Sequence, residues 1–143
     1  MKILVINGPN LNMLGIREPE IYGGETYETL LVQIDEWAKE LDCDVECFQS
    51  NHEGDIIDKI QNALGDFDGI VINAGGYTHT SIAILDAVKA VNIPTVEVHL
   101  TDIAQREPFR RQSFVGLACC EHFIGKGMEG YRLALQYLCE NYG

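Results

Sequence analysis

Two ionisable side chains stand close together in an otherwise apolar stretch of the sequence. Glu97 and His99 are separated by one residue in Glu97-Val98-His99-Leu100. On an extended strand such residues face the same side, so the carboxylate and the imidazole are expected to be neighbours. A carboxylate beside an imidazole orients the ring and favours its protonated form. The pair therefore predicts either a general acid or a structural pair whose charges satisfy each other.

A candidate base lies in the segment that follows the N-terminal apolar run. Arg17 and Tyr22 both fall between Pro9 and Glu25, a stretch rich in Asn, Gly and Pro with no helical period. A guanidinium near a phenol favours the phenolate, which would make Tyr22 a general base. Loops this long in small domains are usually functional, although the same residue types are common in plain surface loops.

Two further segments carry residues suited to binding a small anion. In Asn73-Ala74-Gly75-Gly76-Tyr77-Thr78-His79 the glycines allow the backbone to approach a ligand closely, or they form a tight turn with a surface histidine. Backbone N–H groups at Leu100 and Thr101 could hold a carboxylate. Arg106 and Arg110 are four residues apart and would share a face of a helical turn, as anion ligands or as solvated surface.

The elements that must position these residues alternate regularly along the chain. Apolar or alternating runs predict strands over 2–7, 44–49, 69–73, 94–100 and 122–125. Helical spacing predicts helices over 26–41, 53–64, 81–91 and 128–141, the third with Ile82, Leu85 and Val88 facing inward. This alternation predicts an α/β fold: a flavodoxin-like, doubly wound, five-stranded parallel sheet of order 2-1-3-4-5 with helices on both faces. In such sheets ligands bind beyond the carboxyl ends of the strands, where the candidate residues fall.

Bulk composition excludes several classes of protein. The 143 residues, 46% of them hydrophobic, fit a single catalytic domain over residues 1–143. A net charge of -12 disfavours binding to nucleic acid or to an anionic membrane, and no apolar run is long enough to span a bilayer. Five cysteines without a CxxC pair indicate reduced thiols, and the absence of a signal peptide indicates a cytoplasmic protein.

Blocks of sequence over essentially the whole chain match the pattern of one enzyme family. The first is Asn7-Gly8-Pro9-Asn10-Leu11-Asn12, followed by Gly15, Arg17-Glu18-Pro19 and Tyr22-Gly23. The second is Asn73-Ala74-Gly75-Gly76-Tyr77-Thr78-His79-Thr80-Ser81. The third is Glu97-Val98-His99 with Arg106-Glu107 and Phe109-Arg110-Arg111, before a C-terminal Gly125, Gly127, Gly130 and Tyr131. In this order and with these gaps, the blocks resemble the type II 3-dehydroquinate dehydratases.

The resemblance implies a catalytic role for each of five residues. Tyr22, as phenolate, would remove the proton beside the ketone of 3-dehydroquinate, and Arg17 would stabilise the phenolate. Asn10 would position a water molecule that stabilises the enolate. His99, oriented by Glu97, would protonate the departing hydroxyl to give 3-dehydroshikimate.

The resemblance also implies a set of substrate-binding residues. These are Asn73, Gly75, His79, Asp86, Leu100, Thr101 and Arg110. Asn73 with the backbones of Leu100 and Thr101 would hold the carboxylate, while His79 and Arg110 would contact ring hydroxyls. Thr101-Asp102 stands where the family often has Ser-Asn, so an inward Asp102 would place a negative charge near that carboxylate.

The resemblance further implies an oligomeric state and a metabolic pathway. The family forms a homo-oligomeric dodecamer, a tetramer of trimers, in which Asp86 would reach a neighbouring subunit's site. The resemblance implies an enolate reaction without a cofactor, a metal or a lysine imine. The residue types agree, because no lysine falls in the three site segments and no carboxylate or histidine cluster suited to a metal is evident in the sequence. The reaction belongs to the shikimate pathway of aromatic amino acid biosynthesis or to quinate catabolism.

Two other classes of function remain open from the residues alone. A flavodoxin-like binding module or receiver domain would need a Thr/Ser-rich phosphate loop or an acidic cluster after the first strand, where this chain has Asn-Gly-Pro-Asn. A catalytically silent relative that serves as an assembly scaffold would share the fold but not the activity. The presence of all the matched catalytic residues favours the enzyme.

Overall fold

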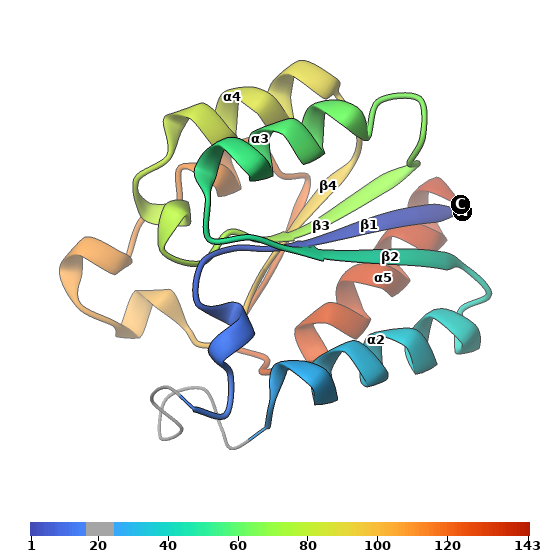
Figure 1. Ribbon diagram of the computed structural model, residues 1–143, viewed down its shortest axis with the longest axis horizontal. Coiled ribbons are helices and arrows are strands. Elements are labelled where there is room, and N and C mark those ends of the chain that lie inside the picture. The colour runs from blue at the N-terminus through green and yellow to red at the C-terminus, as the bar shows by residue number, and fades with distance from the viewer. Residues whose placement is uncertain (17–24) are drawn as a thin grey trace.

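The computed structural model describes residues 1–16 and 25–143. The described residues form a parallel sheet of five strands in the order β2-β1-β3-β4-β5 (Figure 1). Its strands are β1 (Lys2–Asn7), β2 (Asp44–Gln49), β3 (Gly69–Asn73), β4 (Thr95–His99) and β5 (Glu121–Ile124). This is the flavodoxin-like order, so the predicted fold class and strand order are both confirmed.

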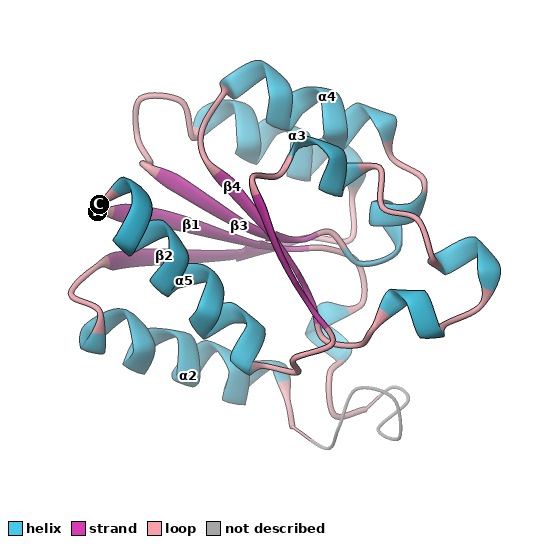
Figure 2. Ribbon diagram, turned by 180° about the vertical axis from the view of Figure 1, so that it is seen from behind, coloured by secondary structure: helices cyan, strands magenta, loops and turns pink. Residues whose placement is uncertain are grey.

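Helices cover both faces of this sheet. They are α2 (Tyr27–Glu40), α3 (Glu53–Asn62), α4 (Ile82–Val91) and α5 (Glu129–Tyr142). Figures 1 and 2 show α3 and α4 side by side on one face, and α2 and α5 on the other. The sheet therefore lies in the middle of three layers, as a doubly wound fold requires.

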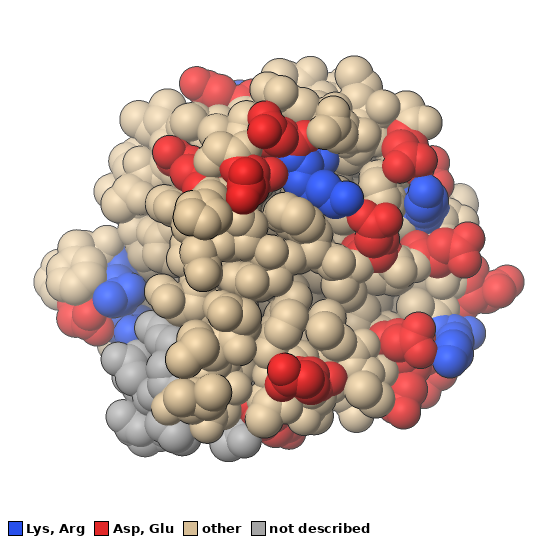
Figure 3. Space-filling view, in the orientation of Figure 1, with Lys and Arg blue, Asp and Glu red and all other residues tan. Residues whose placement is uncertain are grey.

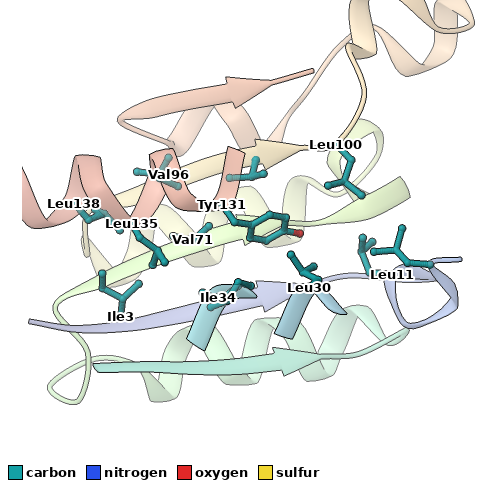
Figure 4. Close-up of a cluster of buried hydrophobic side chains, with 14 residues drawn as sticks. Ile3, Leu11, Leu30, Ile34, Val71, Val96, Leu100, Tyr131, Leu135 and Leu138 are labelled. Atoms are coloured by element: carbon teal, nitrogen blue, oxygen red, sulfur yellow. The ribbon is translucent and has the colours of Figure 1, made fainter. Parts of the chain in front are cut away.

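The sheet divides the hydrophobic core into two clusters. Ile3 and Val5 of β1 pack toward α2 and α5, whereas Leu4 and Ile6 of the same strand pack toward α3 and α4. Because β1 is buried on both faces, its sequence is continuously apolar instead of alternating. Figure 4 shows the cluster on the α2 and α5 side, which surrounds the fully buried ring of Tyr131.

Side-chain hydrogen bonds cap the N-termini of two helices and fix the residue at which each helix begins. Thr26 precedes α2, and its Oγ1 accepts a hydrogen bond from Thr29 N at 3.1 Å. Ser81 precedes α4 and accepts from Ile84 N at 2.9 Å. The helix thus turns Ile84 into the core, and Ile82 is 55% exposed. The prediction that Ile82 faces inward was wrong, because the buried stripe of α4 is centred on Ile84, Ala87, Val88 and Val91, and Ile82 lies on the opposite side of the helix.

Short 3-10 helices follow the carboxyl ends of the strands. They are η1 (Leu11–Met13) after β1, η2 (Gly75–His79) after β3, and η3 (Ile103–Gln105) and η4 (Pro108–Arg110) after β4. The first corrects the expectation of a loop without any helical turn after Pro9. A single turn has no apolar period to detect, which is why the sequence pattern did not predict it.

The surface reflects the acidic composition of the chain. Acidic side chains are scattered over the face shown in Figure 3, and basic side chains are fewer there, in keeping with the net charge of -12. Among the described helices, none combines the length and apolar character that crossing a bilayer requires.

Candidate active site

A cavity of about 240 Å³ opens at the carboxyl edge of the sheet. Its described lining consists of Pro9, Asn10, Leu11, Leu14, Asn73, Gly75, Gly76, His79, Leu100, Arg106 and Arg110. These residues come from the segments that follow β1, β3 and β4, where the strand order of the sheet reverses. Six of the predicted site residues are therefore brought together here: Asn10, Asn73, Gly75, His79, Leu100 and Arg110.

Glycines let the loops after β1 and β3 touch at the floor of the cavity. Gly8 N donates a hydrogen bond to Asn73 O at 2.8 Å, and a Cβ at Gly8 would lie only 2.3 Å from Ala74 O. Gly75 adopts φ +61°, and a Cβ there would lie 2.9 Å from Pro9 O. Any side chain at either position would force the two loops apart, so the shape of the cavity depends on both glycines.

Buried hydrogen bonds fix the Asn73 side chain. Its Nδ2 donates to Tyr131 Oη at 3.0 Å, and its Oδ1 accepts from Gly75 N at 3.2 Å. Tyr131 Oη in turn donates to Asn7 Oδ1 at 2.6 Å, because burial raises the pKa of Tyr131 and keeps the phenol protonated. The second N–H of the Asn73 amide is thus held in one direction at the cavity wall, ready to donate to a ligand.

The end of β2 braces the loop that carries Asn10. Asn10 adopts the left-handed conformation at φ 69°, and its N–H donates to Asn51 Oδ1 at 3.0 Å. Gln49 Nε2 donates to the same Asn51 oxygen at 3.1 Å and to Gly8 O at 3.2 Å. Sequence reasoning missed this brace. Its signal was the polar run at the end of the strand, which places amides next to the first loop once β2 pairs with β1.

Glu97 and His99 form the predicted pair. Both side chains are buried on β4, and His99 Nε2 lies 2.8 Å from Glu97 Oε2. Burial acts to raise the pKa of Glu97, but hydrogen bonds from His99, Ser113 and His122 and the charge of His99 lower it to about 2. The carboxylate is therefore ionised at neutral pH and accepts a hydrogen bond from His99 Nε2–H. Glu97 does not engage the other ring nitrogen of His99, Nδ1, and the next residue along the chain, Leu100, lines the cavity.

Two further donors to Glu97 were not predicted. Ser113 Oγ donates to Glu97 Oε2, and His122 Nδ1 lies 2.8 Å from Glu97 Oε1. Ser113 belongs to the loop after η4, and His122 lies on β5 in register with Glu97. Local spacing carries no signal for either contact, because each depends on how distant segments pair.

Basic groups gather on one side of the cavity. His79 Nδ1 donates to Gln112 O at 2.7 Å, and Arg110 Nε pairs with Glu107 Oε2 at 2.8 Å. Burial lowers the pKa of His79, and the nearby charges of His99, Arg110 and Arg106 lower it further. A neutral His79 with Nδ1 as its donor offers Nε2 as an acceptor for a hydroxyl. The two arginines add the local positive charge that an anion needs against an acidic surface.

Comparison with known proteins gives the family. Residues 1–139 match the family described as dehydroquinase class II. The chain belongs to this family. A 3-dehydroquinate dehydratase from Caldicellulosiruptor saccharolyticus is 55% identical over 143 residues, which cover 99% of each chain. The crystal structure of a type II dehydroquinase from Butyrivibrio crossotus matches with a TM-score of 0.95 at 54% identity, covering 96% of this chain and 97% of that one.

A second crystal structure, of a type II dehydroquinase from Propionibacterium acnes, matches with a TM-score of 0.94 at 41% identity. It covers 98% of this chain and 97% of that one. The resemblance drawn from the sequence is thereby confirmed, and with it the expectation of a hydro-lyase of the dehydroquinase family.

Two predicted residues of this dehydroquinase lie outside the described residues. Tyr22 and Arg17 both fall in the segment 17–24, so their roles stay predictions. Leu11 and Leu14 line the cavity, and Ile16 is the last described residue before the segment 17–24. The described chain therefore leads from the cavity to that segment.

Of the predicted site residues that the structure describes, Glu97, His99, Asp86 and Thr101 are not among those that line the cavity; His99 directly precedes Leu100, which does. Asp86 is exposed on α4, and Thr101 is half-buried with its Oγ1 accepting from Arg106 Nη1 at 3.4 Å. Asp102 is exposed and caps η3 by accepting from Ala104 N at 3.0 Å. Its carboxylate is therefore engaged with the backbone that follows it, and the inward orientation that would oppose a bound anion is not adopted.

Proposed function

We propose that this dehydroquinase removes water from 3-dehydroquinate to give 3-dehydroshikimate through an enolate, without a lysine imine or a metal ion. The observation that carries the proposal is the buried Glu97–His99 pair beside a small polar cavity with basic groups on one wall. A proton donor next to an anion-binding cavity is what the elimination of a hydroxyl from a hydroxylated keto-acid needs.

At the acid end, His99 protonates the departing hydroxyl. The Glu97 carboxylate accepts a hydrogen bond from His99 Nε2–H and stabilises the imidazolium that donates the proton from Nδ1. Because both side chains are buried, the pair works in a medium of low dielectric, where the interaction is stronger than in water. His99 is thus held with its second nitrogen toward the substrate.

At the binding end, fixed amides and basic groups hold the substrate. Asn73 directs its free N–H at the substrate carboxylate, together with the backbone N–H groups of Leu100 and Thr101. His79 and Arg110 contact ring hydroxyls, with the His79 tautomer set by its bond to Gln112 O. Gly75 allows the backbone to approach the ring.

At the basic end, Tyr22 as phenolate removes the proton beside the ketone, and Arg17 stabilises the phenolate. Asn10, which lines the cavity and is held by Asn51, positions the water that stabilises the enolate.

The residue types support a mechanism without an imine. The lysines of the chain are Lys2, Lys39, Lys59, Lys89 and Lys126. None of them stands among the described residues that line the cavity. A Schiff base with the substrate ketone would need a lysine there. The charge of the enolate is instead met by fixed donors.

A homo-oligomer completes the proposed enzyme. Asp86 is exposed on α4 and does not line the described cavity of its own chain, so it is available to a neighbouring subunit. The dodecamer built as a tetramer of trimers, in the cytoplasm, is the assembly proposed from the family pattern.

The test is incubation with 3-dehydroquinate in the presence of EDTA, followed by the ultraviolet absorbance of the conjugated product. The expected result is full activity with EDTA and no inactivation by borohydride with substrate present. Tyr22→Phe should abolish turnover while the protein stays folded. Inactivation by borohydride would point to an imine, and a failure of the wild-type protein to form product would remove the proposed function.

A further inference from the structure

The buried carboxylate of Glu97 is held from the side opposite His99 by a second imidazole. Glu97 Oε2 accepts from His99 Nε2 at 2.8 Å and from Ser113 Oγ, and Glu97 Oε1 accepts from His122 Nδ1 at 2.8 Å. The His122 side chain is 41% exposed, whereas those of Glu97 and His99 are 2% and 6% exposed. A continuous chain of hydrogen bonds therefore leads from the surface to the candidate acid.

The fold leaves the carboxylate almost no freedom. A Cβ at Gly116 would lie 2.6 Å from Glu97 Oε1, so the backbone of η5 (Val115–Ala118) closes one side of it. Gly116 N donates to Ser113 Oγ at 3.0 Å, which directs the hydroxyl proton of Ser113 toward Glu97. His122 contacts the carboxylate from the side that faces the solvent.

The strand register explains why His122 reaches this position. In the parallel pair of β4 and β5, Glu97 is in register with His122. Because β5 is the edge strand of the sheet, a side chain on it can contact a buried group on β4 and still touch water. Each carboxylate oxygen has two lone pairs, so every hydrogen bond from a charge-assisted donor stabilises the ionised group. A buried carboxylate oxygen without a hydrogen-bond donor would destabilise the protein.

We infer that His122 is a positioning residue for the proposed dehydration, acting through Glu97 on His99. By holding Oε1, His122 fixes the plane of the carboxylate, so that Oε2 keeps the Nε2 proton of His99 and leaves Nδ1 toward the substrate. His122 touches neither substrate nor reacting atoms. The inference rests on the proposed function for its effect on rate, but the geometry of the three side chains stands without it.

The groups that face this carboxylate come from every neighbouring element. His99 lies on the same strand, His122 on β5, and Ser113 and Gly116 on the loop and on η5. Cys119 is also close to Glu97. Burial raises the pKa of the Cys119 thiol, and the negative charge of Glu97 raises that pKa further, so the thiol stays neutral.

The test compares two substitutions that differ in one hydrogen-bond donor. His122→Asn places an amide N–H close to the position of Nδ1, and His122→Leu removes the donor. We expect kcat of His122→Leu to fall about tenfold with KM within about twofold of wild type, and His122→Asn to recover most of the loss. His52→Leu, the same change at an exposed histidine away from the cavity, is the matched control and should leave kcat unchanged.

Proton exchange separates positioning from a general loss of structure. Exchange of the substrate proton beside the ketone does not use His99, so it should keep its wild-type rate in His122→Leu while dehydration slows. Equal kcat values for the Leu and wild-type proteins, or equal loss in the Asn and Leu variants, would overturn the inference. If His122→Leu does not fold, His122→Ala supplies the same comparison.

A measurement without substrate tests the role of His122 independently of the proposed dehydratase activity. In protein labelled with ¹⁵N-histidine, at a pH high enough for the His99 ring to be neutral, the NMR signals of His99 should show one tautomer with the proton on Nε2 in the wild type and in His122→Asn. The same signals should show a tautomer mixture in His122→Leu. An unchanged tautomer in His122→Leu would overturn the inference whether or not 3-dehydroquinate is the substrate.

Discussion

At the scale of single residues, the proposed chemistry depends on an imidazole whose two nitrogens have different tasks. Nε2 of His99 is committed to Glu97, which is ionised because its three donors outweigh the effect of burial on its pKa. Nδ1 is therefore the nitrogen that can give a proton to a leaving hydroxyl. The acid and the base are different groups, so the two halves of the reaction can be separated by substitution.

Replacing the acid should stop the second half of the reaction and spare the first. In His99→Ala we expect dehydration to fall by about 10²–10⁴-fold, as general acid catalysis is lost. Exchange of the proton beside the ketone with deuterium should continue, because its base is Tyr22. The measurement is mass or NMR detection of deuterium in recovered substrate, with Tyr22→Phe as the variant that should lose both. A parallel loss of exchange and dehydration in His99→Ala would contradict the stepwise assignment.

The lowered pKa of Glu97 should make the free energy of unfolding depend on pH in the acidic range. Its folded pKa of about 2 lies below its ordinary value of 4.5, so the carboxylate contributes stability above about pH 4.5 and loses it as pH falls toward 2. The contribution is on the order of 3 kcal/mol.

Denaturant unfolding at a series of pH values checks this sign. Between pH 4.5 and 2 the wild type should lose more unfolding free energy than Glu97→Gln, which has no proton to bind at that position. Parallel curves for the two proteins over this range would show that the hydrogen bonds to Glu97 do not favour its ionised form.

At the scale of the elements, the cavity exists because the loops after β1 and β3 touch. Gly8→Ala would place a Cβ 2.3 Å from Ala74 O, which is backbone and cannot move aside cheaply. We expect a loss of about 1–3 kcal/mol in unfolding free energy and a larger KM, since Asn73 and Gly75 would shift with the loop. Gly54→Ala on α3, with nothing within 4 Å of the added Cβ, is the control and should be neutral or stabilising. Unaltered KM in Gly8→Ala would mean that the cavity does not need this contact.

Periodicity explains why so much of the fold could be predicted from the sequence. Buried parallel strands such as β1 and β3 are continuous apolar runs, and the helices show one apolar face. The same period of two on β4 predicted that Glu97 and His99 meet. The turn η1 could not be predicted, because a single turn carries no periodic signal. Ile82 was misplaced because the three-residue spacing of Ile82, Leu85 and Val88 drifts away from the buried face of α4.

Contacts set by register between strands account for what the sequence did not reveal of the site. His122 joins Glu97 only because β5 pairs with β4 in one register, and Gln49 reaches the first loop only because β2 pairs with β1. The strand order was predicted, but neither register can be read from the spacing of residues along the chain. The sequence blocks that match the family predicted the cavity residues through a resemblance, not through their geometry.

At the scale of the whole molecule, an acidic surface encloses a locally basic cavity. The net charge of -12 repels an anionic substrate at long range, whereas Arg106 and Arg110 attract it at short range. Binding should therefore depend on these two side chains far more than on the overall charge. Asp86 is exposed on α4, and its proposed role is at the site of a second subunit.

Hybrid oligomers can show whether Asp86 acts across subunits. Asp86→Ala and His99→Ala should each lower activity when assembled alone. When the two are unfolded together and reassembled, sites that combine an intact His99 with an intact neighbouring Asp86 should restore part of the activity. The measurement is the specific activity of the mixture against the sum of the two separate variants. No gain on mixing would place Asp86 outside the active site or within its own subunit.

The most direct measurement of the central claim is a crystal structure with a ring-shaped hydroxy acid that binds but does not react. The account predicts that the ligand occupies the cavity with its carboxylate on Asn73, and that Tyr22 Oη and His99 Nδ1 lie on opposite sides of the ring. A ligand-bound structure with Tyr22 and His99 on separate faces of the subunit, joined by no neighbouring chain, would contradict it.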